Sequence, residues 1–174
     1  MPQIQSLSHH RRLSDNYGEH HQQTDALTSR YLHDSKDSNE STNQNHHRSN
    51  DRHAMLVQRI AVEQKVMSAM LSVLGYRVTQ AEDSGKALLY FGREPCEVVI
   101  SELDMPQLNG IQLARCIRKH SPQTRILMMT PCCQAEVVDH LESRLVDGWL
   151  FKPFRMDVLK DMLTCMKAPQ KDVG

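Results

Sequence analysis

Apolar and polar positions follow two different patterns along this chain. No apolar residue occurs between His33 and His53, and only scattered ones occur before it. Such a stretch cannot bury enough surface to offset the conformational entropy lost on ordering. We therefore predict that residues 1–53 form a disordered, His-rich polar arm and linker, with room only for a short helix around Asp25–Leu32.

From Ala54 onward, short apolar runs alternate with helical patterns. The runs predict strands over residues 54–59, 76–81, 96–101, 125–130 and 147–153. The segments between and after them predict helices over residues 62–74, 84–92, 110–120, 134–144 and 156–166, with Val62, Val66, Met70 and Leu74 on one face of the first. Apolar strands joined by helices favour a doubly wound α/β fold, in which a five-stranded parallel sheet is covered on both faces.

In a doubly wound sheet, a functional site lies beyond the carboxyl ends of the strands. Those predicted ends carry Gln58 and Arg59, Ser101 and Glu102, Thr130, and Lys152. Polar and charged residues at these positions make this edge the candidate site.

The strings VVISELDMPQLNG, ILMMT and DGWLFKPF resemble the receiver domain of two-component response regulators. LGYRVTQAEDSGKAL fits the second strand and helix of that family, and the resemblance covers about residues 54–167, leaving 168–174 as a C-terminal tail. It implies a flavodoxin-like (βα)5 fold. It also implies that Glu102 stands at the phosphoacceptor position, Thr130 at the hydroxyl position, Lys152 at the lysine position and Trp149 at the switch aromatic.

The same resemblance implies that the pocket is degenerate. Gln58 and Arg59 stand where the family has the two acids that help hold Mg²⁺, and no Asp or Glu lies between Met55 and Val62. Glu102 adds a methylene to the acceptor aspartate, about 1.5 Å of reach, and catalytic geometry is sensitive to about 1 Å. We expect Mg²⁺ binding to be lost, Glu102 to pair with Lys152, and Asp104 and Arg59 to complete the charge balance.

These features favour a stand-alone pseudo-receiver that acts by phosphorylation-independent contact with a protein partner, such as a histidine kinase, and is not an enzyme. Trp149 and Pro153 are the candidate partner surface, with a cis bond expected before Pro153. Trp149 could equally be core, and Glu102 could mimic a phosphorylated state or be inert. A residual phosphoryl-accepting regulator is one alternative, and a metal-binding tail on an inert scaffold is another.

Composition limits these functions further. The 21 basic and 21 acidic residues give no net field that would attract nucleic acid or anionic membrane. Eight of the ten histidines lie in residues 1–53 as a compositional feature without metal-ligand spacing. The five cysteines form no C-x-x-C pair, and without a signal peptide or apolar span the chain is expected to be cytoplasmic.

Overall fold

The computed structural model describes residues 52–131 and 143–166. Five strands and four α-helices alternate in it: β1 (Arg52–Val57), α2 (Ala61–Val73), β2 (Tyr76–Ala81), α3 (Ser84–Arg93), β3 (Val98–Glu102), α4 (Gly110–His120), β4 (Arg125–Thr130), β5 (Gly148–Phe151) and α6 (Met156–Cys165). A 3-10 helix, Ser143–Leu145, precedes β5. The strands form one parallel sheet in the order β2-β1-β3-β4-β5, which confirms the predicted fold class.

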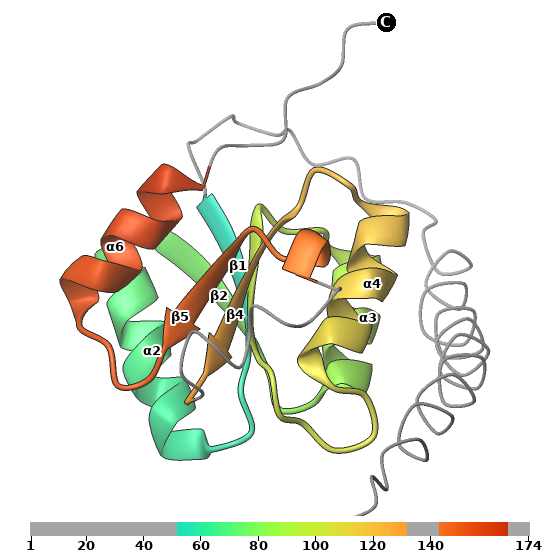
Figure 1. The fold of residues 1–174 in the computed structure, drawn as a ribbon, viewed down its shortest axis with the longest axis horizontal. Helices are drawn as coiled ribbons and strands as arrows, with labels where there is room; N and C mark the ends of the chain where they lie inside the picture. Colours follow the sequence, from blue (N-terminus) through green and yellow to red (C-terminus); the bar gives the residue numbers. More distant parts are fainter. Residues whose placement is uncertain (1–51, 132–142, 167–174) are drawn as a thin grey trace, which may run out of the picture.

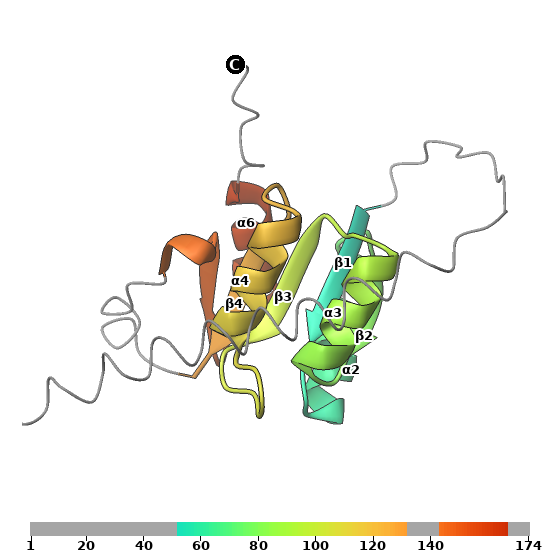
Figure 2. The same ribbon diagram turned by 90° about the vertical axis from the view of Figure 1, so that its right-hand side faces the viewer.

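Helices cover both faces of this sheet. Helices α2 and α6 lie against one face, and α3 and α4 lie against the other (Figures 1 and 2). Each face has its own buried cluster: Leu88, Val99 and Ile117 are members of one, and Leu71, Ile100 and Leu159 of the other. The central strands are therefore apolar on both sides, as their sequence pattern predicts.

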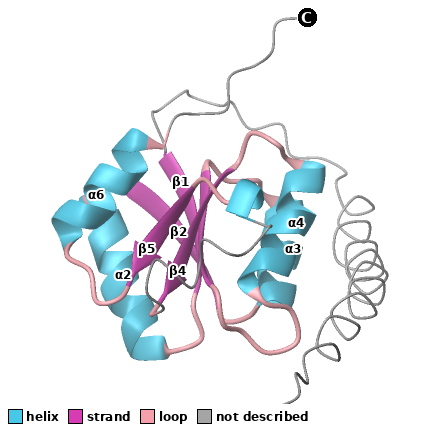
Figure 3. Cartoon of the chain, in the orientation of Figure 1, coloured by secondary structure: helices cyan, strands magenta, loops and turns pink. Residues whose placement is uncertain are grey.

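Local signals set the starts of the helices on the α3–α4 side. Asp83 caps α3 by accepting a hydrogen bond from the Lys86 amide. Asn109 and Gln112 form a reciprocal capping box at the start of α4. Gly110 is required there because a Cβ would lie 2.4 Å from the carbonyl oxygen of Glu102. Thus α4 begins close against the end of β3, and the loops meet at the carboxyl edge of the sheet (Figure 3).

Two predicted boundaries need correction. Strand β1 begins at Arg52, so the last two residues of the predicted arm belong to the domain. His53 is buried in this strand, and its Nε2 lies 2.9 Å from the Thr79 hydroxyl. This hydrogen bond gives the buried imidazole a polar partner. The strand also ends at Val57, before Gln58 and Arg59. The rest of the arm, the tail 168–174 and most of the predicted helix 134–144 lie outside the described residues.

The predicted face of the first helix was also wrong. Met67 and Leu71 are the buried residues of α2, whereas Val62 and Val66 are 71% and 50% exposed. Steps of four residues advance about 40° around an α-helix because one turn has 3.6 residues. The row from Val62 to Leu74 therefore turns from solvent toward the core.

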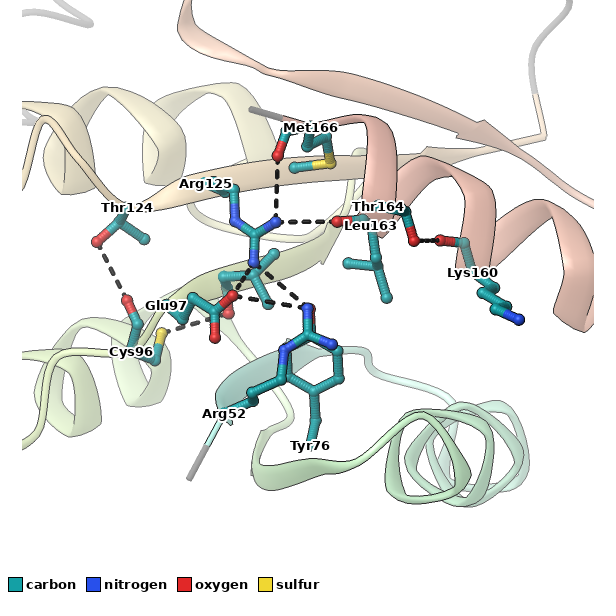
Figure 4. A network of polar contacts seen from close by, with 11 residues as sticks. Arg52, Tyr76, Cys96, Glu97, Thr124, Arg125, Lys160, Leu163, Thr164 and Met166 are labelled. Atoms are coloured by element: carbon teal, nitrogen blue, oxygen red, sulfur yellow. Dashed lines mark hydrogen bonds and ion pairs between the residues drawn. The ribbon is translucent and has the colours of Figure 1, made fainter. Parts of the chain in front are cut away.

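A network of arginines ties α6 to the amino edge of the sheet (Figure 4). The Arg125 guanidinium donates to the carbonyls of Leu163 and Met166, at 2.9 and 3.2 Å, and to Glu97. Arg52 lies 4.1 Å from the centre of the Tyr76 ring. Cations are favourable at a helix C-terminus, where carbonyls lack intrahelical partners. Arg125 therefore holds the end of α6 against β4 and β3.

Candidate functional site

Four polar side chains predicted from the sequence lie at the carboxyl edge of the sheet. Glu102 and Thr130 are the last residues of β3 and β4, and Gln58 and Lys152 directly follow β1 and β5. Gln58 and Thr130 are completely buried. The parallel sheet thus brings together residues that are up to 94 positions apart, from Gln58 to Lys152.

The ammonium of Lys152 is the centre of this site. Lys152 Nζ lies 2.9 Å from Glu102 Oε1 and also donates to Glu63 Oε2. The Lys152 and Glu102 side chains are 21% and 13% exposed. The expected Glu102–Lys152 pair is present, but the ammonium bridges two carboxylates rather than one.

Glu63 is the functional residue that sequence reasoning missed. It lies in the first turn of α2, one residue beyond the stretch from Met55 to Val62 that contains no acid. Gln58 Nε2 donates to Glu63 Oε2 at 2.9 Å, while Gln58 Oε1 accepts from the Ile60 amide at 3.1 Å. The signal available was an acidic residue in the first turn of the helix that follows β1, where the helix dipole favours a negative charge.

Gln64 fixes the loop that carries Gln58. Its side-chain amide donates to the carbonyls of Gln58 and Ala81, both at 3.2 Å. The backbone amide of Gln58 also donates to the Ala81 carbonyl at 3.0 Å, which extends the β1–β2 pairing by one residue. The Gln58 side chain is therefore held with its NH₂ group toward Glu63.

Two of the predicted pocket residues lie outside this cluster. Arg59 and Asp104 are both exposed, and Lys152 is balanced by Glu63 and Glu102 instead. The expected charge balance through Arg59 and Asp104 was therefore wrong. Thr130 is buried at the end of β4, and its carbonyl accepts a hydrogen bond from the Lys152 backbone amide at 2.9 Å.

The charges around Lys152 stabilise its ammonium form. Burial lowers the pKa of Lys152, but hydrogen bonds and charges from Glu102 and Glu63 outweigh it and raise the pKa above its usual 10.5. Within the described part of the chain, no three His, Cys, Asp or Glu side chains are grouped to hold a metal ion. The cluster is thus two carboxylates around one fixed cation.

An apolar groove borders the site on the α2 side. The Lys152–Pro153 bond is cis, as the sequence resemblance implied. Pro153 and Phe154 line a groove of about 470 Å³ together with Val62, Val66, Met67 and Met70, and with Glu63 and Lys152 at its edge. Trp149 is partly buried and packs against the core cluster on the α3–α4 face, away from this groove.

Comparison with known proteins gives one consistent family. The model of the response regulator receiver domain matches residues 55–164. Sensor histidine kinase AruS of Pseudomonas aeruginosa is 29% identical over 113 residues, which are 63% of this chain and 11% of AruS. Sensor protein EvgS of Escherichia coli is 30% identical over 99 residues, 57% of this chain and 8% of EvgS. The chain thus spans about a tenth of these sensor proteins.

Solved structures agree with this family. Chemotaxis protein CheY4 of Vibrio cholerae has a TM-score of 0.62 and 27% identity, covering 67% of this chain and 99% of that one. The receiver domain of sensor histidine kinase PA1611 from Pseudomonas aeruginosa, solved with a magnesium ion coordinated in its active site cleft, has a TM-score of 0.60 and 28% identity. It covers 67% of this chain and 97% of that one. Among the residues described for our chain, no helix is long and apolar enough to cross a bilayer.

Proposed function

Because this chain belongs to the response regulator receiver domain family, we propose that it works in two-component signalling as a pseudo-receiver held in one state by its own lysine. It would act by docking onto a signalling protein, without phosphoryl transfer. The observation that carries the proposal is the Lys152 ammonium between Glu63 and Glu102.

The residues present do not fit a resident Mg²⁺. Mg²⁺ is a hard cation that takes oxygen ligands in near-octahedral geometry. Gln58, at one position where the family resemblance places an acid, turns its NH₂ group toward Glu63 and gives its amide oxygen to Ile60. The two nearby carboxylates already neutralise Lys152. A divalent ion would have to displace that ammonium, leaving a second cation beside the metal.

Glu102 supplies the second part of the argument. It ends β3, where the sequence resemblance places the phosphoacceptor aspartate, and its carboxylate contacts the lysine that would otherwise hold a phosphoryl oxygen. A permanent negative charge against Lys152 satisfies that lysine without a modification. We therefore infer that Glu102 replaces the phosphorylated aspartate as a fixed partner of Lys152, and that it is not an inert relic.

A sensor histidine kinase, or another protein of the same pathway, is the proposed partner. The support is the kind of protein that this chain resembles, since AruS and EvgS are sensor proteins. Pro153 directly follows Lys152 and is exposed. A partner bound to this surface would therefore contact the residue next to the Lys152 cluster. Trp149, the other candidate contact, is half-buried in β5.

Metal and phosphoryl uptake test this proposal together. We expect the wild-type protein to show no change in Trp149 fluorescence with Mg²⁺ up to about 10 mM, and no phosphoryl incorporation from a small donor such as acetyl phosphate. The matched variant is Gln58→Asp/Arg59→Asp/Glu102→Asp, which restores three acids at the positions implied by the family resemblance and should bind Mg²⁺. Glu94→Asp, at an exposed residue that pairs with Arg77 near the amino end of β2, is the control and should behave as the wild type.

One result would favour the alternative function. We call the arrangement in which Glu63 and Glu102 hold the Lys152 ammonium the locked site. Millimolar or tighter Mg²⁺ binding by the wild type, abolished by Glu102→Ala, would overturn the locked site. If the same protein also took up phosphoryl groups in the presence of Mg²⁺, it would be a residual phosphoryl-accepting regulator. The metal-binding tail is a separate hypothesis, because residues 1–51 lie outside the described residues and metal titration of the full chain would test them.

A further inference from the structure

Helix α2 presents an apolar stripe to solvent as well as an apolar face to the sheet. Val62, Val66 and Val73 are 71%, 50% and 76% exposed, and Ala69 is exposed between them. These four residues are separated by steps of four, three and four, the spacing that aligns side chains where two helices pack side by side. A helix that is apolar on opposite sides is normally covered on both.

The polar residues of α2 leave this stripe almost uncharged. Glu63 and Gln64 turn toward the carboxyl edge of the sheet, where they bind Lys152, Gln58 and Ala81. Ser72 donates its hydroxyl back to the Ser68 carbonyl at 2.8 Å. Of the two charged residues of α2, Glu63 is thus held by Lys152, and Lys65 is exposed. Interfaces are depleted of charge at their centres in this way.

The stripe is continuous with the groove beside Lys152. Val62 and Val66 belong to both, and Met67 and Met70 of α2 also line the groove, together with Phe154. Methionine side chains adapt to the shape of an incoming group. A helix lying along the stripe would therefore place a side chain at the mouth of the groove.

We propose that this stripe is an interface between two copies of the chain, in which the two α2 helices pack antiparallel about a two-fold axis between Val66 and Ala69. In that arrangement Val62 of each copy meets Val73 of the other, and Val66 meets Ala69. The same patch serves both subunits, as a two-fold interface requires. This inference does not depend on the proposal that Lys152 holds the site in one state. Because Val62, Val66 and Pro153 line the same groove, a signalling partner at Pro153 would compete with the second copy.

Charge favours a second copy in this orientation. The last turn of α2 carries no basic residue, so the helix itself supplies no cation to the negative end of its dipole. The antiparallel pairing brings the exposed Arg59 of one copy beside that end of the other, near Leu74 and Gly75. A parallel pairing would instead place the Lys65 side chains of the two copies near each other, where their positive charges would repel.

The interface is expected to be weak. Stable interfaces bury about 1,200–2,000 Å² in total, and α2 has only 13 residues. A dimer that forms with a Kd in the micromolar range, and dissociates on dilution, fits a contact of three helical turns.

Sedimentation velocity of the full chain from about 5 µM to 500 µM tests the interface. The wild type should change from monomer to dimer over this range. Val66→Glu and Val73→Glu should each raise the Kd at least tenfold, since each places a charge in the stripe. The matched control is Val158→Glu, which puts the same charge on a 44% exposed valine of α6, outside the stripe, and should leave the Kd unchanged.

Two further measurements make the result decisive. Urea midpoints of the valine variants should match the wild type, because these side chains are exposed, which separates lost association from lost folding. Arg59→Ala should raise the Kd about threefold if the helices are antiparallel.

A wild type that stays monomeric at 500 µM would overturn the proposal and leave the stripe to a different protein. A dimer that survives Val66→Glu and Val73→Glu would overturn it too, by placing the contact elsewhere.

Discussion

The two ends of the sheet each hold an ion cluster, and the two clusters have opposite composition. At the amino edge, Arg52 and Arg125 surround the carboxylate of Glu97 (Figure 4). At the carboxyl edge, Glu63 and Glu102 surround the ammonium of Lys152. One cluster has an excess of positive charge and the other an excess of negative charge, within a single small domain.

The difference teaches which cluster is structural. The guanidinium of Arg125 binds backbone as well as side chains, since besides pairing with Glu97 it donates to two carbonyls at the end of α6. The Lys152 ammonium donates to two side-chain carboxylates, those of Glu63 and Glu102, and it borders the apolar groove. A cluster bonded to backbone stabilises the fold, whereas a cluster of side chains next to a groove can respond to a ligand or partner.

Removing the guanidinium at the amino edge should have the largest effect on stability. Arg125→Ala should lower the free energy of unfolding by about 3 kcal/mol, because it removes a buried guanidinium from its half-exposed partner Glu97 and leaves buried helix carbonyls without donors. Urea unfolding measures this loss. Arg77→Ala is the control, since Arg77 pairs with Glu94 on the surface and should cost less than about 0.5 kcal/mol. Equal losses for the two arginines would show that the network does not anchor α6.

Removing the ammonium at the carboxyl edge should cost less. Lys152→Ala should lower the free energy of unfolding by about 2 kcal/mol, because two carboxylates are left close together without their cation. Glu102→Gln should cost about 1 kcal/mol, and the double variant should lose less than the sum of the two by about 1 kcal/mol. This cycle is read by urea unfolding. Strict additivity would mean that Glu102 and Lys152 are not coupled, and the locked site should then be abandoned.

The sequence predicted the order of the strands and helices, and it predicted the Glu102–Lys152 contact. The order follows from the spacing of apolar residues. The contact follows from the family resemblance and from the carboxyl ends of parallel strands, which meet at one edge. It did not predict Glu63, which enters the site from a helix rather than a strand end. Arg125 also looked like an ordinary first residue of a strand, because its partners lie 28 to 49 positions away along the chain.

The exposed stripe on α2 was missed for a different reason. A row of valines, a methionine and a leucine at four-residue steps looks like one helix face, but three such steps turn by about 120°. Whether a residue on that row is buried depends on the direction in which the sheet lies. Sequence period alone leaves that direction open when a helix is apolar on two sides.

Arg52 belongs to the amino-edge cluster, although the sequence placed it in the polar arm. Its substitution therefore tests whether this cluster extends into the predicted arm. Arg52→Ala should lower the free energy of unfolding by about 1 kcal/mol, through loss of the contact with the Tyr76 ring and of a 3.7 Å ion pair with Glu97. Thermal or urea unfolding of the full chain measures it. Arg48→Ala, four residues earlier and within the predicted linker, is the control and should have no effect. If Arg52→Ala also had none, the domain would begin after Arg52, as first predicted.

The smallest expected effect is the pH dependence of the carboxyl-edge cluster. Its carboxylates raise the pKa of Lys152 above 10.5 in the folded protein. A raised pKa means that the stabilisation is present in full below the unfolded pKa and is lost as pH rises through the folded pKa. Since solvent screens part of the interaction, the loss should stay below about 1 kcal/mol. Other lysines and tyrosines titrate in the same range, so the measurement is the difference in unfolding free energy between the wild type and Lys152→Met from pH 9 to 12. That difference should shrink toward high pH. A difference that stays flat, or grows, would mean that Lys152 gains nothing from Glu63 and Glu102 and that the carboxyl-edge cluster is held together by its neighbours instead.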